Sequence, residues 1–357
     1  MFNKQTIKDV NVKGKIVLVR VDYNVPLEDG KVTSDLRIKA SLPTINYLIE
    51  NEAKKIILIS HLGRPEGKKS PEFSMKPVAE SLQKLLPSEK IKFINDVSGP
   101  DVEQILENSK DCRVFLLENL RFFKGEESNS EEFIREIVDS TGAELFVQDG
   151  FAVIHRAHAS TSAIAKCLPV YAGLLLEKEV ENLLRVTESP EKPLLFILGG
   201  AKVEDKEPLI EKFIDKADDI VVGGKIAADG YQSDNTKIYV AEDFDEDSEK
   251  NKLDIGPVST HKIVEKIQNA KTVVWNGVLG KVEDPAFATS STIVAKTLGE
   301  NPEITSIICG GDTTGFVENL MIEAPELKFS LVSTGGGASL ELLCGKTLPG
   351  LETIEDK

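Results

Sequence analysis

The sequence has no continuous apolar run of the ~18–20 residues that a membrane-spanning helix requires. Its first residues, Met1–Gln5, lack the apolar stretch of a signal peptide. The few cysteines, Cys112, Cys167, Cys309 and Cys344, are widely separated, and their spacing fits neither a metal site nor a dense disulfide framework. These absences argue against a membrane or secreted protein, and we expect a protein of the reducing cytoplasm.

An excess of basic residues is also missing. The 43 lysines and arginines are outnumbered by 59 aspartates and glutamates, which gives a net charge of −16. We therefore expect no nucleic-acid partner and no membrane-surface partner. An acidic chain that binds an anion must gather its basic groups locally, so the positions of the arginines carry more information than their number.

The two common nucleotide-binding fingerprints are absent as well. Gly345-Lys346-Thr347 would end a G-x-x-x-x-G-K-[ST] loop, but Leu340 stands where the leading glycine is needed. The missing G-x-G-x-x-G pattern counts against a Rossmann dehydrogenase, and there is no G-x-S-x-G elbow or H-E-x-x-H zinc helix. A nucleotide bound by this chain must be held in a different way.

What is present is an alternation of short apolar runs with helical patterns, in a chain of 357 residues that is long enough for two domains. Runs of this kind predict parallel strands covered on both faces. We predict an α/β fold of two Rossmann-like parallel-sheet domains joined by a hinge helix. The predicted strands are Lys15–Val21, Lys55–Ser60, Arg113–Leu117, Glu144–Gln148, Leu194–Leu198, Asp219–Val222, Thr272–Trp275, Ser306–Cys309 and Lys328–Val332.

The domain boundary is predicted near a helical pattern at Tyr171–Val186, whose leucines and valines fall on one side. It is followed by a loop and a new strand. The expected domains are 1–170, 187–340 and a tail of 341–357, with 171–186 between them. A second helix is predicted at Glu207–Ala217. We interpret the acidic stretch Glu242–Asp254 as a solvated loop rather than a cation site.

In the first half, basic side chains recur just after the predicted strands, where ligands of open α/β sheets gather. These residues are Arg37, His61, Arg64, Arg121 and Arg156. Any one of them taken alone would more often form a surface ion pair. Because the fork of an arginine binds carboxylate and phosphate bidentately, their recurrence at strand ends predicts one pocket for a small, multiply anionic ligand.

In the second half, glycines follow the strands instead. Glycine lets the backbone approach a phosphate, and amides at a helix start donate to it. A single Gly-Gly pair is usually only a tight turn, and Asp312 could merely cap a helix. Five such strand ends in one domain favour a nucleotide cradle, in which lysines add charge and Asp312 could reach Mg²⁺. The segments are Leu198–Lys206, Gly223–Lys225, Asn276-Gly277, Gly310–Thr313 and Thr334–Ser339.

Taken in order, these segments resemble the phosphoglycerate kinase family from about residue 15 to 351. The matching stretches are RVDYNVP, DLRIKASLPTI, SHLGRP, LLENLRF, HRAHAS, LGGAKVEDK, DIGP, WNG, CGGDT and STGGGASLELLCGKTLPG. Several of them are long and specific. The resemblance implies reversible, Mg²⁺-dependent phosphoryl transfer from 1,3-bisphosphoglycerate to ADP, giving 3-phosphoglycerate and ATP, by a monomer whose domains close about a hinge.

The resemblance also implies roles for individual residues. The triose-binding set is Asp22, Asn24, Arg37, His61, Arg64, Arg121 and Arg156. The nucleotide-binding set is Gly200, Lys202, Lys206, Gly223, Gly224, Asn276, Glu283, Gly311, Asp312 and Thr313, with Glu283 on the ribose and Asp312 on the metal. The catalytic set is Arg37, Lys202, Gly336 and Gly337. Domain 1–170 would bind 3-phosphoglycerate, domain 187–340 would bind the nucleotide, and the tail 341–357 would return to the first domain.

Several positions depart from the pattern of the family. Val278 stands in place of a proline, while Cys309 and Lys225 each stand in place of a glycine. The chain is also shorter than usual between Lys225 and Asn276, beside the expected adenine site. A divergent triose-phosphate-binding homologue with weakened or altered nucleotide use is therefore the alternative. A carbamate or acetate kinase would not explain the HLGRP and HRAH segments together.

Overall fold

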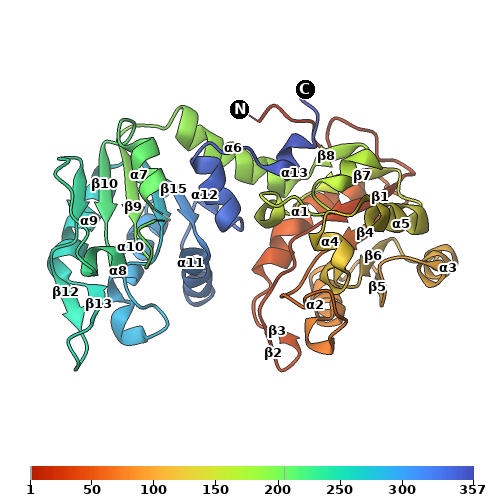
Figure 1. The fold of residues 1–357 in the computed structure, drawn as a ribbon, viewed down its shortest axis with the longest axis horizontal. Coiled ribbons are helices and arrows are strands. Elements are labelled where there is room, and N and C mark those ends of the chain that lie inside the picture. Colours follow the sequence, from red (N-terminus) through yellow and green to blue (C-terminus); the bar gives the residue numbers. More distant parts are fainter. Residues whose placement is uncertain (1, 205) are drawn as a thin grey trace. The chain divides into compact units, whose positions relative to one another are not determined.

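The structure is a computed structural model that describes residues 2–204 and 206–357. The chain divides into two compact units (Figure 1). The amino-terminal unit contains Phe2–Val180 and Thr347–Lys357, and the carboxy-terminal unit contains Glu181–Lys346. Each unit is built on a six-stranded sheet whose neighbouring strands are parallel. The predicted α/β fold class with two parallel sheets is confirmed.

The sheet of the amino-terminal unit has the strand order β5-β6-β4-β1-β7-β8. Alternate residues of its strands pack against α1 and α2, while α3 and α5 lie on the other face (Figure 1). The bounds are β1 Ile16–Arg20, β4 Lys55–Ile59, β5 Ile91–Ile94, β6 Val114–Leu117, β7 Leu145–Gln148, β8 Val170–Ala172, α1 Leu36–Glu50, α2 Lys76–Leu85, α3 Pro100–Asn108, α4 Lys124–Glu127 and α5 Glu131–Thr141. A small hairpin, β2 Leu27–Glu28 with β3 Lys31–Val32, lies outside this sheet.

The sheet of the carboxy-terminal unit has the order β11-β10-β9-β14-β15-β16. One face packs on α9, α10 and α11, and the other carries Phe196, whose ring centroid lies 4.2 Å from that of Phe213 in α7. The bounds are β9 Leu194–Leu198, β10 Asp219–Val222, β11 Ile238–Val240, β14 Thr272–Asn276, β15 Thr305–Cys309, β16 Leu331–Val332, α7 Glu207–Phe213, α8 Gly224–Ala228, α9 Pro257–Asn269, α10 Thr289–Gly299, α11 Gly311–Glu323 and α12 Gly337–Leu343.

The helix predicted at Tyr171–Val186 is α6, Leu174–Glu188. Its predicted start is wrong, because Tyr171 belongs to β8 and pairs with Val147 of β7. Near the end of the chain, α13 (Pro349–Glu352) lies within the amino-terminal unit, where Gly350 N donates to Ile154 O at 2.8 Å. Residues 2–204 and 206–357 contain no helix with the length and apolarity that crossing a membrane demands.

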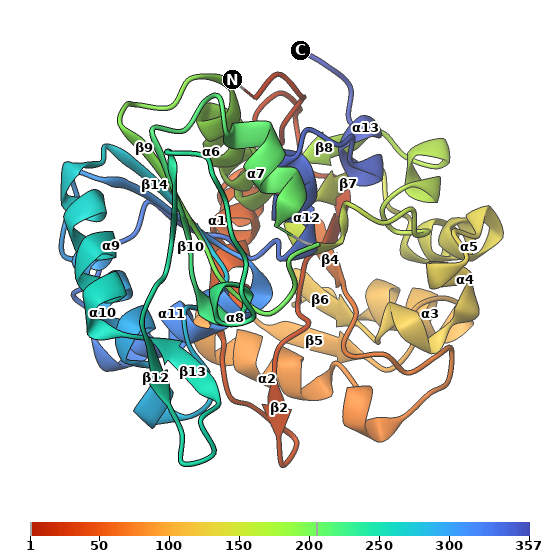
Figure 2. The same ribbon diagram turned by 60° about the vertical axis from the view of Figure 1, so that its left-hand side comes forward.

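The acidic stretch Glu242–Asp254 is largely exposed, as predicted, but the prediction of a loop is wrong. It forms an antiparallel hairpin of β12 (Phe244–Glu246) and β13 (Lys252–Ile255), which Figure 2 shows below the main sheet of this unit. Asp254 is buried and accepts a bond from Ser290 N at 3.0 Å, at the start of α10. Asp243 accepts from the first-turn amide of Ser259 in α9 at 2.8 Å. Helix-start amides thus replace the water that these carboxylates would otherwise need.

The carboxyl ends of β9 and β14 lie where the strand order reverses. The chain runs from β9 to β10 and β11 on one side, and from β14 to β15 and β16 on the other. The backbones meet closely here, since Gly199 N donates to Asn276 O at 2.9 Å. Gly277 has a φ of +99°, and a Cβ on it would lie 2.1 Å from Gly199 O. Such a crevice is the usual ligand site of an open α/β sheet.

Gly277→Ala is expected to lower the free energy of unfolding by more than about 1–3 kcal/mol. The alanine would have to adopt an unfavourable positive φ, and its Cβ would also clash with the backbone of Gly199. Gly311→Ala is the matched control, since nothing lies within 4 Å of a Cβ added there. The control is expected to stay within about 1 kcal/mol of the unsubstituted protein. Thermal unfolding of both variants checks this, and equal stability of the two would contradict the close approach.

A buried carboxyl anchors the start of α6 in the amino-terminal unit. Asp149 Oδ1 accepts from the amides of Leu175 at 3.0 Å and Leu176 at 3.3 Å. Burial raises the pKa of Asp149 from 3.8 to about 7. The folded protein therefore keeps a proton that the unfolded chain loses above pH ~4, so this group makes stability fall as pH rises from about 4 to about 7.

Asp149→Asn keeps an acceptor oxygen but cannot ionise. Relative to the unsubstituted protein, the variant is expected to gain stability as pH rises from 4.5 to 8, by up to about 4 kcal/mol. Thermal unfolding of both proteins at several pH values measures the difference. A difference that does not change with pH would show that Asp149 has an ordinary pKa.

Candidate active site

The basic residues predicted in the first half lie after the parallel strands of the amino-terminal unit. His61 follows β4, Arg37 stands in the first turn of α1, Arg121 lies in a short 3₁₀ turn after β6, and Arg156 follows β7. Parallel strands place their carboxyl ends at one edge of the sheet. The elements therefore bring side chains that are far apart in the sequence to the same edge.

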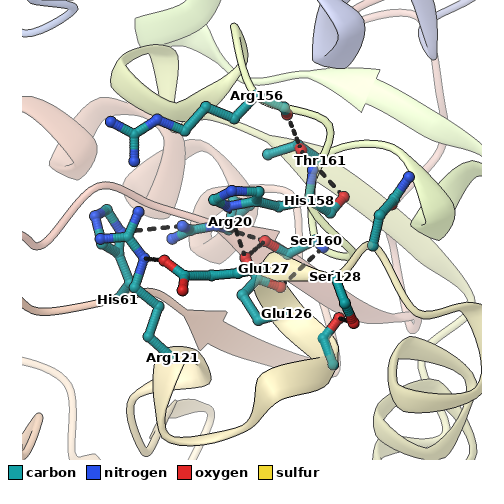
Figure 3. Close-up of polar contacts among 12 residues, drawn as sticks. Arg20, His61, Arg121, Glu126, Glu127, Ser128, Arg156, His158, Ser160 and Thr161 are labelled. Atoms are coloured by element: carbon teal, nitrogen blue, oxygen red, sulfur yellow. Dashed lines mark hydrogen bonds and ion pairs between the residues drawn. The ribbon is translucent and has the colours of Figure 1, made fainter. Parts of the chain in front are cut away.

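His61 is the centre of this cluster. Its side chain is buried, and its Nδ1 lies 3.1 Å from Nη2 of Arg20 (Figure 3). Burial lowers the pKa of His61 well below its usual 6.5, and the positive charges of nearby arginines lower it further. The arginines concerned are Arg20, Arg121, Arg156 and Arg37. Three of the four predicted arginines, together with Arg20, are thus close enough to act on one imidazole.

Carboxylates and amides complete this edge. Asp22 is buried and forms an ion pair with Arg37, while its Oδ1 lies 4.0 Å from His61 Nδ1. Asn24 Oδ1 accepts from Gly63 N at 2.9 Å. Arg64 differs from the rest of the predicted set. It is exposed, and among the residues that the structure describes it makes no hydrogen bond or ion pair with another member of that set.

Two basic residues of this edge were not assigned from the sequence. Arg20 is buried at the end of β1, and His158 lies two residues after Arg156. Burial and neighbouring arginines lower the pKa of His158 to about 4 and that of Arg121 to about 10. The signal available in the sequence was their place in the RVDYNVP and HRAHAS stretches. Burial itself was not readable there.

In the carboxy-terminal unit, a cavity of about 320 Å³ lies beyond the strand ends. Most of the predicted nucleotide-binding and catalytic residues line it. The lining is Gly200, Ala201, Lys202, Lys206, Asn276, Gly277, Gly310, Gly311, Asp312, Thr313, Gly336, Gly337 and Leu340. Glycines and lysines dominate this surface, which suits a ligand with several phosphate oxygens.

The floor of this cavity is a network of buried polar groups. Lys206 Nζ donates to Asn276 Oδ1, and Asn276 Nδ2 donates to Cys309 Sγ at 3.4 Å. Gly277 N donates to Thr313 Oγ1 at 2.7 Å, which ties the end of β14 to the first turn of α11. The thiol of Cys309 is therefore buried beneath the cavity as a partner of Asn276.

A second cavity, of about 260 Å³, shares Gly200, Ala201 and Asp312 with the first. The predicted residues Gly224 and Glu283 line it. So do Phe244, Lys252 and Leu253 of the β12–β13 hairpin, together with the unusual Lys225 and Val278. Gly223 lines neither cavity, and its amide donates to Leu198 O at 2.8 Å. The two cavities form one continuous surface whose outer wall is the short hairpin.

Asp312 is the residue best placed to reach a metal ion, because it lines both cavities. In the part of the chain that the structure describes, no group of three or more histidine, cysteine or acidic side chains could hold a metal by itself. A lone carboxylate fits Mg²⁺, which keeps several waters and is commonly shared with substrate phosphates. The residues present therefore suit a metal that arrives with a nucleotide.

Comparison with known proteins gives one consistent result. The family model described as phosphoglycerate kinase matches residues 7–243 and 228–346. The curated phosphoglycerate kinases of Dictyoglomus turgidum and Fervidobacterium nodosum are both 40% identical, over 396 and 404 aligned residues. The alignments cover 98% and 100% of this chain and 98% and 99% of the relatives. Both alignments are longer than this chain of 357 residues, so the relatives contain residues that it lacks.

Solved structures agree with the sequence comparison. Phosphoglycerate kinase from Coxiella burnetii has a TM-score of 0.78 at 34% identity, and the enzyme from Pyrococcus horikoshii has a TM-score of 0.84 at 29% identity. Each match covers 98% of both chains. With the family model and full-length relatives in agreement, this chain belongs to the phosphoglycerate kinase family.

Proposed function

We propose that the chain catalyses reversible, Mg²⁺-dependent phosphoryl transfer from 1,3-bisphosphoglycerate to ADP, giving 3-phosphoglycerate and ATP in glycolysis, and the reverse reaction in gluconeogenesis. Members of this family are phosphotransferases with a carboxyl group as acceptor. The observation that carries the proposal is the arginine cluster around His61, found in the same chain as a glycine-lined cavity with Asp312. We further propose that the protein is a cytoplasmic monomer.

On the triose side, the arginines supply positive charge that does not titrate near neutral pH. We assign the carboxylate and phosphate of 3-phosphoglycerate to Arg37, Arg121 and Arg156, with His61 and the Asp22–Asn24 segment orienting the ligand. Arg64, which is exposed, would have to turn toward the ligand when it binds. Residues 1–170 would thus form the 3-phosphoglycerate-binding domain.

On the nucleotide side, the phosphates would lie in the glycine-lined cavity of domain 187–340. Lys202 and Lys206 would neutralise them, and Asp312 would hold Mg²⁺, which polarises the phosphate oxygens when bound. Glu283 lies in the adjoining cavity, where a ribose hydroxyl could donate to it. Gly223 does not line the cavity, so its part would be to shape the turn before α8.

The reaction needs no general base. In the direction of ATP formation, an oxygen of the β-phosphate of ADP attacks the acyl phosphorus, and the bond from phosphorus to the carboxylate oxygen breaks. Both the attacking and the leaving oxygen are ionised at pH 7. Catalysis then consists of alignment and of stabilising charge on the transferring phosphoryl group, which we assign to Arg37, Lys202 and the Gly336-Gly337 amides. The two ligands must meet with water excluded, so we propose closure about 171–186.

Arg37→Ala is expected to lower the turnover number about 10²–10³-fold, because one preorganised donor to the moving phosphoryl group is lost. Arg135→Ala is the control, since Arg135 is an exposed side chain paired with Glu131 on the surface of α5. A coupled assay for ATP formation measures both variants. Turnover of Arg37→Ala within a few-fold of the unsubstituted protein would remove Arg37 from the catalytic set.

The alternative, a triose-phosphate-binding homologue with weakened or altered nucleotide use, is favoured by one observation. The outer wall of the second cavity is only a short hairpin, with Lys225 and Val278 at unusual positions. The retained Lys202, Lys206 and Asp312 argue for turnover. Proposing ordinary use of ADP, we expect the highest kcat/KM with ADP when ADP, GDP and CDP are compared in the same assay. A higher value for GDP or CDP, or binding of 3-phosphoglycerate without turnover, would instead support the alternative.

A further inference from the structure

A buried carboxylate lies behind the arginine cluster, and none of the roles assigned so far uses it. Glu126 of α4 is fully buried. Its Oε1 accepts from Ser160 Oγ at 2.6 Å, and its Oε2 accepts from Ser160 N at 3.1 Å (Figure 3). A buried charge of this kind is stabilised only through its partners. Both oxygens of Glu126 are hydrogen-bonded to the same residue, Ser160, and its Oε1 also lies 3.9 Å from Nδ1 of His158.

The Ser160 hydroxyl also faces the arginine cluster. A hydroxyl can donate one hydrogen bond and accept others. Here it donates to Glu126 and accepts from Nε of Arg20 at 2.9 Å. The guanidinium of Arg20 is further fixed by a hydrogen bond that Nη1 donates to Val21 O at 2.6 Å. Ser160 therefore bridges a buried negative charge to a buried positive charge and sets the plane of the guanidinium.

The orientation of Arg20 determines which form of His61 is present. Nη2 of Arg20 lies 3.1 Å from Nδ1 of His61, and a guanidinium can only donate hydrogen bonds. Nδ1 must then be the acceptor, which leaves the ring neutral with its proton on Nε2. The charged groups around His61 agree with this assignment. Among the residues that the structure describes, Asp22 is the only acidic side chain within 4.0 Å of the ring, whereas four arginines place positive charge near it.

We propose that Ser160 and Glu126 are positioning residues that hold His61, through Arg20, as a neutral Nε2–H hydrogen-bond donor for the anionic triose ligand. The inference rests on the proposed function, because it takes His61 to be a ligand contact. A neutral donor adds direction without adding charge, and the surrounding arginines supply the charge. The site thereby keeps one form across the neutral pH range, because arginines do not titrate there and His61 is held neutral.

Ser160→Ala removes the bridging hydroxyl and leaves the rest of the cluster in place. The loss of a hydrogen bond to charged groups is expected to raise KM for 3-phosphoglycerate about tenfold, with kcat within about twofold and KM for the nucleotide unchanged. Ser162→Ala is the matched control. Within the residues that the structure describes, its hydroxyl is buried and has no hydrogen-bond partner, so both constants should stay as they are.

A direct measurement of His61 does not depend on turnover. The chain has four histidines, so the imidazole ¹⁵N spectrum is simple enough to assign with a His61→Gln variant. In the ligand-free protein, His61 is expected to show an unprotonated Nδ1 and a protonated Nε2 that do not change between pH 5.5 and 8. In Ser160→Ala, the two nitrogens should move toward a mixture of tautomers, and the ratio of KM to that of the unsubstituted protein should become pH-dependent. Taking this ratio removes the ionisation of the substrate itself.

The outcomes separate this inference from the proposed function. An active protein whose His61 spectrum and triose KM are the same in Ser160→Ala and Ser162→Ala would overturn the positioning role. A spectrum with Nδ1 protonated in the unsubstituted protein would do the same. A spectrum that behaves as expected in a protein without ATP-forming activity would support the inference about His61 and overturn the proposed function. Glu126→Gln, which keeps the side-chain volume, should shift the spectrum in the same direction if Ser160→Ala does not fold.

Discussion

The amino-terminal unit depends on keeping four like charges together around one imidazole. Arg20, Arg37, Arg121 and Arg156 all act on His61, and burial together with repulsion from Arg156 and Arg20 lowers the pKa of Arg121 to about 10. Carboxylates offset this repulsion at defined places: Asp22 pairs with Arg37, Glu127 lies 3.1 Å from Arg121, and Glu126 acts through Ser160. An acidic chain of net charge −16 can therefore present a concentrated basic surface at one sheet edge.

The carboxy-terminal unit meets a similar demand with backbone instead of arginine. Its cavity is lined by glycines, two lysines and one carboxylate. The close approach of Gly199 and Gly277 leaves no room for side chains at the carboxyl ends of β9 and β14. Each choice suits its proposed ligand. A small acid that carries a carboxylate and a phosphate is matched by arginine forks, whereas a polyphosphate with a metal is matched by amides and mobile lysines.

The sequence predicted the long, β-rich central strands well, because runs such as LLFIL at 194–198 are apolar throughout and buried on both faces. It missed β5, β8 and β11, which are short strands at the edges of the two sheets. The roles of Arg37, Arg121 and Arg156 could be predicted because these arginines follow strands. The roles of Ser160 and Glu126 could not be predicted, since a buried serine and glutamate resemble ordinary polar residues until the fold places them against Arg20.

The acidic stretch shows why a composition-based interpretation fails at such places. Counted as charges, Glu242–Asp254 indicates a solvated loop. Most of its acidic side chains are exposed, but Asp243 and Asp254 are bonded at the starts of α9 and α10. These two carboxylates tie the β12–β13 hairpin to α9 and α10, which pack on the main sheet. Phe244 and Lys252 of the hairpin can therefore line the second cavity. The family model matches in two pieces that overlap at 228–243, which agrees with a shortening in this region. A shortened chain can therefore still form a defined outer wall, because helix-start amides anchor the carboxylates of the hairpin.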